Sequence, residues 1–182
     1  NGKKPLGATG FYIKLAQRIL HIFTIKTGLG LLYDVDMRLR PSGNAGLLVC
    51  HVDGFATYQT ENAWTWEHQA LGRARFITGC RELQERFSAV RLNILSKPRV
   101  LLELAEEVVS MREKMREHLA KGDAKNIDLK QDAGGIADIE FIVQFMLLAH
   151  TCAFPSLAKW PDNVRILADL AKLSLITKAE AD

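Results

Sequence analysis

The sequence has few cysteines, few prolines and no long apolar run among its 182 residues. Cys50, Cys80 and Cys152 stand apart, without a Cys-x-x-Cys pair or a histidine at ligand spacing, which argues against a zinc site and a disulfide framework. Scattered thiols in odd number favour a reducing, cytoplasmic environment. The most apolar stretch, residues 141–149, is much shorter than the roughly 20 residues that cross a bilayer, so we expect no membrane partner.

An excess of charge of either sign is also lacking, because 24 Lys and Arg residues oppose 21 Asp and Glu residues. The net charge of +3 is spread along the chain in alternating signs, so we expect no nucleic-acid partner. An apolar fraction of 48% excludes a disordered or fibrous protein. The chain begins at Asn1 without a methionine or a signal peptide, so we expect it to be part of a longer protein.

Hydrophobic spacing predicts a mostly α fold with a small β part. The apolar residues of 10–27 recur at helical spacing, whereas residues 31–39 alternate with a period of two and predict a strand. A turn-forming sequence at 41–46 leads to a second predicted strand at 47–51. Together these strands would form a β-hairpin.

The pattern changes near Asp53, after which only helices are predicted. They are expected at residues 53–61, 64–78, 81–95, 98–121, 136–152 and 164–173, the fourth of them ended by Gly122 and Asp123. The helix at 136–152 is apolar on nearly every face, which is typical of the centre of a bundle. We therefore expect residues 1–53 to form a helix plus β-hairpin and residues 54–182 to form a helical bundle domain.

A row of four charged residues is the first candidate for chemistry. Strand alternation would place Asp34, Asp36, Arg38 and Arg40 on one face, about 7 Å apart from one to the next. Carboxylates bind a hard cation such as Mg²⁺, and guanidinium groups bind phosphate, so the row would suit a Mg²⁺-nucleotide. The alternative is a solvated strand face on which neighbouring opposite charges neutralise one another.

Two glycines that precede the 136–152 helix are the second candidate. The first N–H groups of a helix that begins after Gly134 and Gly135 can hold an anion. The alternative is a simple turn, with Asp138 and Glu140 complementing the helix dipole. The pair of glycines alone does not decide between them.

Residues 64–75 are the third candidate, because charged side chains lie beside two tryptophans. Glu67, His68, Arg73 and Arg75 could line a cleft. Such a segment is more often an amphipathic brace with tryptophan in the core and arginine in water. No nucleophile motif, phosphate-binding loop or dinucleotide fingerprint accompanies it.

Four blocks in the same order resemble one bacterial enzyme family. They are Leu-Tyr-Asp-Val-Asp-Met-Arg-Leu-Arg-Pro-Ser-Gly-Asn-Ala-Gly at 32–46, Trp-Thr-Trp-Glu-His-Gln-Ala-Leu-Gly-Arg-Ala-Arg at 64–75, Gly-Gly-Ile-Ala-Asp-Ile-Glu-Phe at 134–141 and Trp-Pro-Asp-Asn-Val-Arg-Ile-Leu at 160–167. The chain resembles the bifunctional glutamine synthetase adenylyltransferases, and most closely their C-terminal, adenylylating half.

The resemblance implies a fold and an activity. Residues 1–53 would be the C-terminal part of a nucleotidyltransferase α/β domain, and 54–182 the helical bundle domain that follows it. The family transfers AMP from ATP to a tyrosine of glutamine synthetase and can also remove it. An in-line attack on the α-phosphate, with pyrophosphate leaving and two metal ions stabilising the reacting oxygens, is the implied mechanism.

The resemblance also assigns site residues. Asp36 would be the catalytic carboxylate that binds Mg²⁺, with Asp34 as the less favoured choice. The residues expected near the nucleotide are Arg38, Arg40, Lys130, Gly134 and Gly135. The family's Gly-Ser motif and the Asp-x-Asp pair that follows it, which supply two further carboxylates, do not occur in the 182 residues. We therefore expect this chain alone to be inactive and to bind Mg²⁺-ATP weakly or not at all.

The implied partners are ATP, glutamine synthetase and the PII signalling protein. The alternative function is a helical docking module that binds glutamine synthetase or PII, with the charged row merely structural. A segment of a PII uridylyltransferase, which has a similar pair of domains, is a further alternative.

Overall fold

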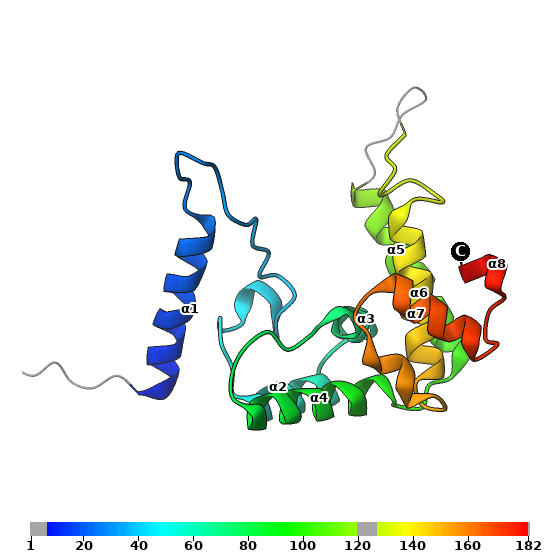
Figure 1. The fold of residues 1–182 in the computed structure, drawn as a ribbon, viewed down its shortest axis with the longest axis horizontal. Helices are drawn as coiled ribbons and strands as arrows, with labels where there is room; N and C mark the ends of the chain where they lie inside the picture. Colours follow the sequence, from blue (N-terminus) through cyan, green and yellow to red (C-terminus); the bar gives the residue numbers. More distant parts are fainter. Residues whose placement is uncertain (1–6, 120–126, 182) are drawn as a thin grey trace, which may run out of the picture. The chain divides into compact units, whose positions relative to one another are not determined.

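A computed structural model of the chain describes residues 7–119 and 127–181. These residues are mostly helical, as the sequence predicts (Figure 1). The α-helices are α1 (Ala8–Thr24), α2 (Val52–Glu61), α3 (Thr65–Arg73), α4 (Arg81–Leu95), α5 (Leu101–Leu119), α6 (Ile136–His150), α7 (Asn163–Lys172) and α8 (Lys178–Ala181), and the 3₁₀ helices are η1 (Gly43–Ala45) and η2 (Pro155–Lys159). Within the described ranges, no helix is both long enough and apolar enough to cross a membrane.

The chain forms two compact units, Asn1–Asn62 and Ala63–Asp182. The first contains α1, η1 and α2, and the second contains α3 to α8. The sequence placed its boundary between residues 53 and 54, so α2 falls on the other side of the division. The assignment of the two parts to a nucleotidyltransferase domain and a bundle domain stays a prediction.

The prediction of two strands is wrong, because the structure shows neither of them. Residues 31–39 and 47–51 have no strand, and Thr27 and Gly30 make an isolated β-bridge within a turn. A hairpin of two strands is marginal in water unless further strands or a helix cover it. Here the backbone N–H of Tyr33 donates to the carbonyl of Phe23 at 3.2 Å, so this segment folds back on the end of α1 instead of pairing with another strand.

The predicted turn at residues 41–46 is present and tightly closed. A Cβ atom at Gly46 would lie 2.0 Å from the carbonyl oxygen of Pro41, so only glycine fits at this position. The guanidinium of Arg40 donates to the carbonyls of Met37, Asn44 and Gly46 at 2.5, 3.3 and 3.3 Å. The side chain of Arg40 therefore holds the loop together from inside.

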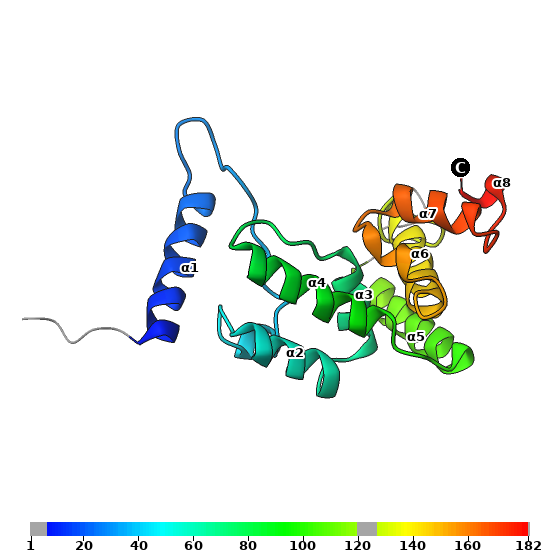
Figure 2. The ribbon, with the colours of Figure 1, turned by 60° about the horizontal axis from the view of Figure 1, so that its bottom comes forward.

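The second unit is a bundle built around α6, which contacts α3, α5, α7 and η2. Figures 1 and 2 show α5 and α6 side by side, with α7 against α6. The prediction that this apolar helix occupies the centre of the bundle is confirmed. Its core comprises Leu95, Leu104, Val108, Val143, Leu147, Leu148, Leu157, Ala158, Ile166 and Leu170.

Helix α3 packs against this bundle and buries His68, Gln69, Leu71 and Gly72. The backbone N–H of Trp64 donates to the Glu67 carboxylate at 2.9 Å, which caps the helix. The amide of Gln69, which is buried, donates to that of Gln144 on α6 at 3.1 Å. A Cβ atom on Gly72 would lie 2.7 Å from Cδ2 of the buried Leu147, so α3 and α6 pack closely here.

Arg91 of α4 is buried, with 8% of its surface exposed, and its hydrogen bonds connect α4 to α3 and to η2. Its Nε donates to the carbonyl of Leu71 at 3.1 Å and its Nη2 to that of Gly72 at 2.6 Å, both in the last turn of α3. Its remaining donors reach the carbonyls of Ala158 and Trp160 at η2. Burial lowers the pKa of the Arg91 guanidinium.

Candidate functional site

In the predicted metal and phosphate row, Asp36 and Arg38 form a closed pair. The Nη2 of Arg38 lies 2.6 Å from Oδ2 of Asp36, and the backbone N–H of Arg38 donates to Oδ1 at 2.9 Å. Both side chains are exposed, at 54% for Asp36 and 77% for Arg38. These hydrogen bonds from Arg38 stabilise the ionised carboxylate and lower the pKa of Asp36 to about 2.

We expect an NMR titration of the Asp36 carboxyl to give a pKa of about 2 in the 182-residue chain. Arg38→Ala should return that pKa toward the ordinary value of 3.8, because the side-chain hydrogen bonds and the positive charge are lost. Lys172→Ala, which removes an exposed cation on α7, serves as the matched control and should leave the titration of Asp36 unchanged. A wild-type Asp36 pKa near 3.8 would contradict the pairing.

The other two members of the row are placed differently. The carboxylate of Asp34 is exposed, whereas Arg40 is half-buried with its donors on loop carbonyls. Arg40 therefore already has acceptors for the groups that would bind phosphate. The proposed phosphate contacts of Arg38 and Arg40 stay predictions.

The fit of these residues to Mg²⁺ is incomplete. In residues 7–119 and 127–181, no group of three or more His, Cys, Asp and Glu side chains could hold a metal ion. Asp36 is ionised at neutral pH and could supply one carboxylate, but it faces Arg38. Asp34 and Asp36 alone do not make a Mg²⁺ site.

The predicted anion site before α6 is a self-capped loop. The N–H groups of Ile136 and Ala137 donate to the carbonyls of Leu129 and Lys130, each at 3.0 Å. The N–H of Gly134 donates to the carboxylate of Asp138 at 2.6 Å. The amides that the sequence left free for an anion thus already have acceptors. Any contact of a nucleotide with Gly134 and Gly135 stays a prediction, as does one with the exposed Lys130.

Both glycines meet demands of the backbone in this loop. Gly134 has φ +81°, which favours glycine. A Cβ atom on Gly135 would approach the carbonyl oxygens of Leu129, Asp132 and Lys130 at 2.7, 2.9 and 3.1 Å. The Gly-Gly pair is therefore explained by the turn itself, without a ligand.

An ion pair between the buried Arg112 of α5 and the half-buried Asp138 of α6, which the sequence did not predict, holds this loop against the bundle. The Nε of Arg112 lies 2.5 Å from Oδ1 of Asp138, and its Nη2 donates to the carbonyl of Gln131 at 2.8 Å. The hydrogen bond from Gly134 and the pairing with Arg112 lower the pKa of the Asp138 carboxyl. The spacing in the sequence could have indicated it, because Arg112 follows Leu104 and Val108 at intervals of four residues, which places all three on one helix face. The structure buries all three side chains.

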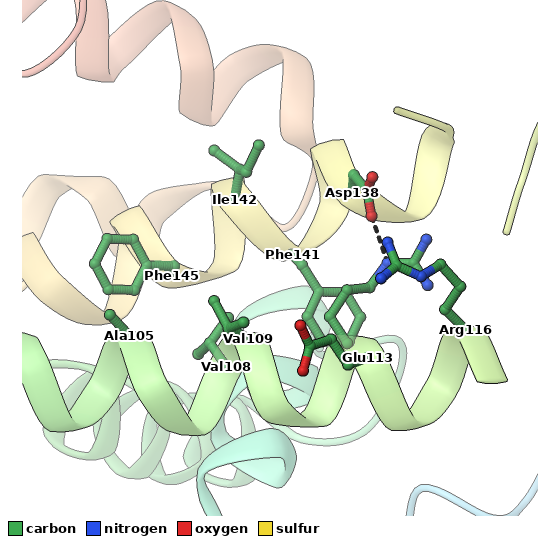
Figure 3. A pocket seen from close by; sticks show the side chains of 10 residues that line it. Ala105, Val108, Val109, Glu113, Arg116, Asp138, Phe141, Ile142 and Phe145 are labelled. Carbon is green, nitrogen blue, oxygen red and sulfur yellow. Dashed lines mark hydrogen bonds and ion pairs between the residues drawn. The ribbon is translucent and has the colours of Figure 1, made fainter. Parts of the chain in front are cut away.

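An apolar groove of about 400 Å³ runs between α5 and α6 beside this ion pair. Figure 3 shows it lined by aliphatic and aromatic side chains, with Arg116 and Asp138 at one end. Val109 and Ile142 are 55% and 59% exposed along it. The groove is a second surface with the character of a binding site, and it contains none of the predicted site residues.

The sequence pattern of the glutamate-ammonia ligase adenylyltransferase family matches residues 1–90. Proteins described as bifunctional glutamine synthetase adenylyltransferase/adenylyl-removing enzymes match the whole chain. The identity is 55% for that of Shewanella loihica, 51% for that of Idiomarina loihiensis and 53% for that of Alteromonas mediterranea, each over 181 residues and 100% of this chain. The resemblance to this family is confirmed.

The chain spans only 18–19% of the length of these adenylyltransferases. It is therefore similar to one segment of them. Residues 109–182 also match the GlnD PII-uridylyltransferase family pattern, which begins within α5 and covers the rest of the bundle. Residues 109–182 thus resemble both kinds of enzyme.

Proposed function

We propose that this chain is a segment of an enzyme that transfers AMP from ATP to a tyrosine of glutamine synthetase and also removes it. The observation that carries the proposal is an identity of 50–55% over 97–100% of the chain to enzymes of that name. Residues 1–53 would complete a nucleotidyltransferase domain of the adenylylating half, and the rest would be its helical bundle. Three free cysteines suit a cytoplasmic location.

In this proposal Asp36 supplies one carboxylate to a Mg²⁺-ATP site. Its low pKa keeps it ionised at neutral pH, as a metal ligand must be. The guanidinium of Arg38 would leave Asp36 and bind a phosphate group of the nucleotide instead. The remaining metal ligands would come from residues outside the 182, so the chain alone would transfer no AMP.

The test is Asp36→Asn in the intact enzyme, with transfer of labelled AMP to glutamine synthetase as the measurement. Loss of a metal carboxylate should lower the transfer rate at least about 100-fold, while binding of glutamine synthetase is kept. Glu82→Gln, an exposed carboxylate-to-amide change on α4, is the matched control and should leave the rate unchanged. An undiminished rate in the Asp36 variant would reject the proposed role.

A docking module for glutamine synthetase or PII is the second candidate function, and the groove between α5 and α6 favours it. Its apolar floor suits the apolar face of a partner helix. The same experiment separates the two functions. Unchanged AMP transfer in Asp36→Asn would leave docking as the function of this segment.

A further inference from the structure

A second cavity in the bundle, of about 440 Å³, has a different chemical character from the apolar groove. It lies between residues 74–76, the middle of α4 and residues 155–161. This volume is within the range of small-molecule sites, about 300–1,000 Å³. Arg75, which the sequence named as a residue that could line a cleft, does line it, whereas none of the residues predicted to bind metal or nucleotide does.

The charged side chains on the wall of this cavity are all positive. Arg75, Arg91 and Lys159 line it, and among its described lining residues there is no Asp or Glu. The rest of the wall offers the hydroxyl of Ser88 and the amide of Gln84, as well as aromatic rings. A cavity walled by three cations without a carboxylate favours an anion of high charge.

The three cations differ in how far they are already engaged. In the described part of the chain, Arg75 is exposed and has no hydrogen-bond or ion-pair partner. Lys159 is exposed, and its ammonium lies 4.5 Å from the centre of the Trp160 ring, which leaves its N–H donors available. Both are therefore able to bind a ligand without breaking existing polar contacts.

Arg91 adds a charge that the fold leaves without a counter-ion. Its hydrogen bonds all go to backbone carbonyls, which are dipoles and carry no net charge. A buried cation is costly unless an opposite charge lies nearby. An anion in the adjoining cavity would supply that negative charge. The lowered pKa of Arg91, which is caused by burial, agrees with the lack of a protein carboxylate beside it.

We propose that this cavity binds a small ligand that carries a phosphate group. Three cations more than neutralise the two negative charges of a phosphate dianion, and guanidinium groups bind its oxygens in pairs. Phe76 and Phe87 on the same wall provide an apolar surface for the organic part of the ligand. The proposal does not depend on the activity proposed above, because the charged row of Asp36 lies in the other compact unit.

The test is a titration of the isotope-labelled 182-residue chain, followed by NMR, with AMP, inorganic phosphate and adenosine as separate probes. About 150 mM salt screens non-specific attraction to the basic surface. AMP and phosphate should shift the backbone amides of residues 74–76, 84–92 and 155–161 in a saturable way. Adenosine, which lacks the phosphate, should bind at least about tenfold more weakly than AMP.

Two exposed cations can be removed without touching the buried Arg91. Arg75→Ala and Lys159→Ala should each raise the Kd for AMP about tenfold, since each removes a charge-assisted contact. Lys172→Ala, which removes an exposed cation elsewhere in the bundle, should leave the Kd unchanged. Unchanged affinity in the first two variants, equal binding of adenosine, or shifts confined to residues 32–46 or 127–138 would each overturn the proposal.

Discussion

Replacing Gly135 by alanine is expected to lower the free energy of unfolding of the bundle by about 3 kcal/mol. The added Cβ would lie 2.7–3.1 Å from three carbonyl oxygens. Those atoms belong to the backbone and cannot rotate away, so the loop must move. That movement would cost the hydrogen bonds from Ile136 and Ala137 that cap α6, each worth about 1 kcal/mol.

Chemical denaturation followed by circular dichroism measures this loss, and the neighbouring glycine provides the control. Gly134 has φ +81° but open space around its Cβ position. Gly134→Ala should therefore cost only about 1 kcal/mol, the penalty of a left-handed backbone. Equal losses in the two variants would show that backbone conformation, and not the contact with carbonyls, explains the pair of glycines.

Arg91→Ala should be the most damaging substitution in the bundle, with a loss of about 4 kcal/mol. It would leave four carbonyls, two of them in the last turn of α3, without their donor. Each unsatisfied buried acceptor costs about 1 kcal/mol or more, and the guanidinium also fills space between α3, α4 and η2.

Comparison of the stability losses of a lysine and an alanine variant shows how much of the effect depends on the charge of Arg91 and how much on the geometry of its guanidinium. Arg91→Lys keeps the charge but cannot reach four carbonyls at once, so it should lose about half as much stability as Arg91→Ala. Arg81→Ala removes an arginine that is 90% exposed on the same helix and should change stability by less than about 0.5 kcal/mol. A loss below about 1 kcal/mol in Arg91→Ala would contradict the role of this side chain.

The helices of the bundle could be predicted because their apolar residues recur at helical spacing. For α4 the predicted and observed bounds agree at Arg81 and Leu95. The predicted helix at 64–78 ends early, at Arg73, because Ala74 adopts an extended backbone. That change of direction coincides with the carbonyls that Arg91 binds, a contact about 20 residues away that local spacing does not reveal.

The spacing of apolar residues was not sufficient to predict strands. Alternation in residues 31–39 predicts one buried face. Val35 and Met37 are indeed less exposed than the neighbouring aspartates, but Leu31, Tyr33 and Leu39 are exposed. A strand also needs a second strand beside it for its backbone hydrogen bonds, and in the described residues this segment pairs with no strand. The sequence therefore predicted the secondary structure wrongly, and the alternation of faces holds only around Val35 and Met37.

The candidate site shows the same limit. Proximity in sequence correctly suggested that Asp36 and Arg38 neutralise each other, as the alternative interpretation of the row held. The brace interpretation of residues 64–75 is supported by contacts such as that of Arg73 with Asn163 at 2.8 Å, but Trp64, expected in the core, is 71% exposed. Neither the Arg40 contacts nor the capped start of α6 could be predicted, because both depend on how a loop closes in space.

The amide contact between Gln69 and Gln144 has a consequence for how α3 and α6 align. Apolar faces alone would tolerate a slide of one helix past the other by a turn, since leucines and valines can exchange partners. A slide would leave the buried amide of Gln69 without its hydrogen bond to the half-buried Gln144, at a cost of about 1–3 kcal/mol. This pair therefore selects a single register for the two helices, and in doing so fixes where the last turn of α3 meets Arg91.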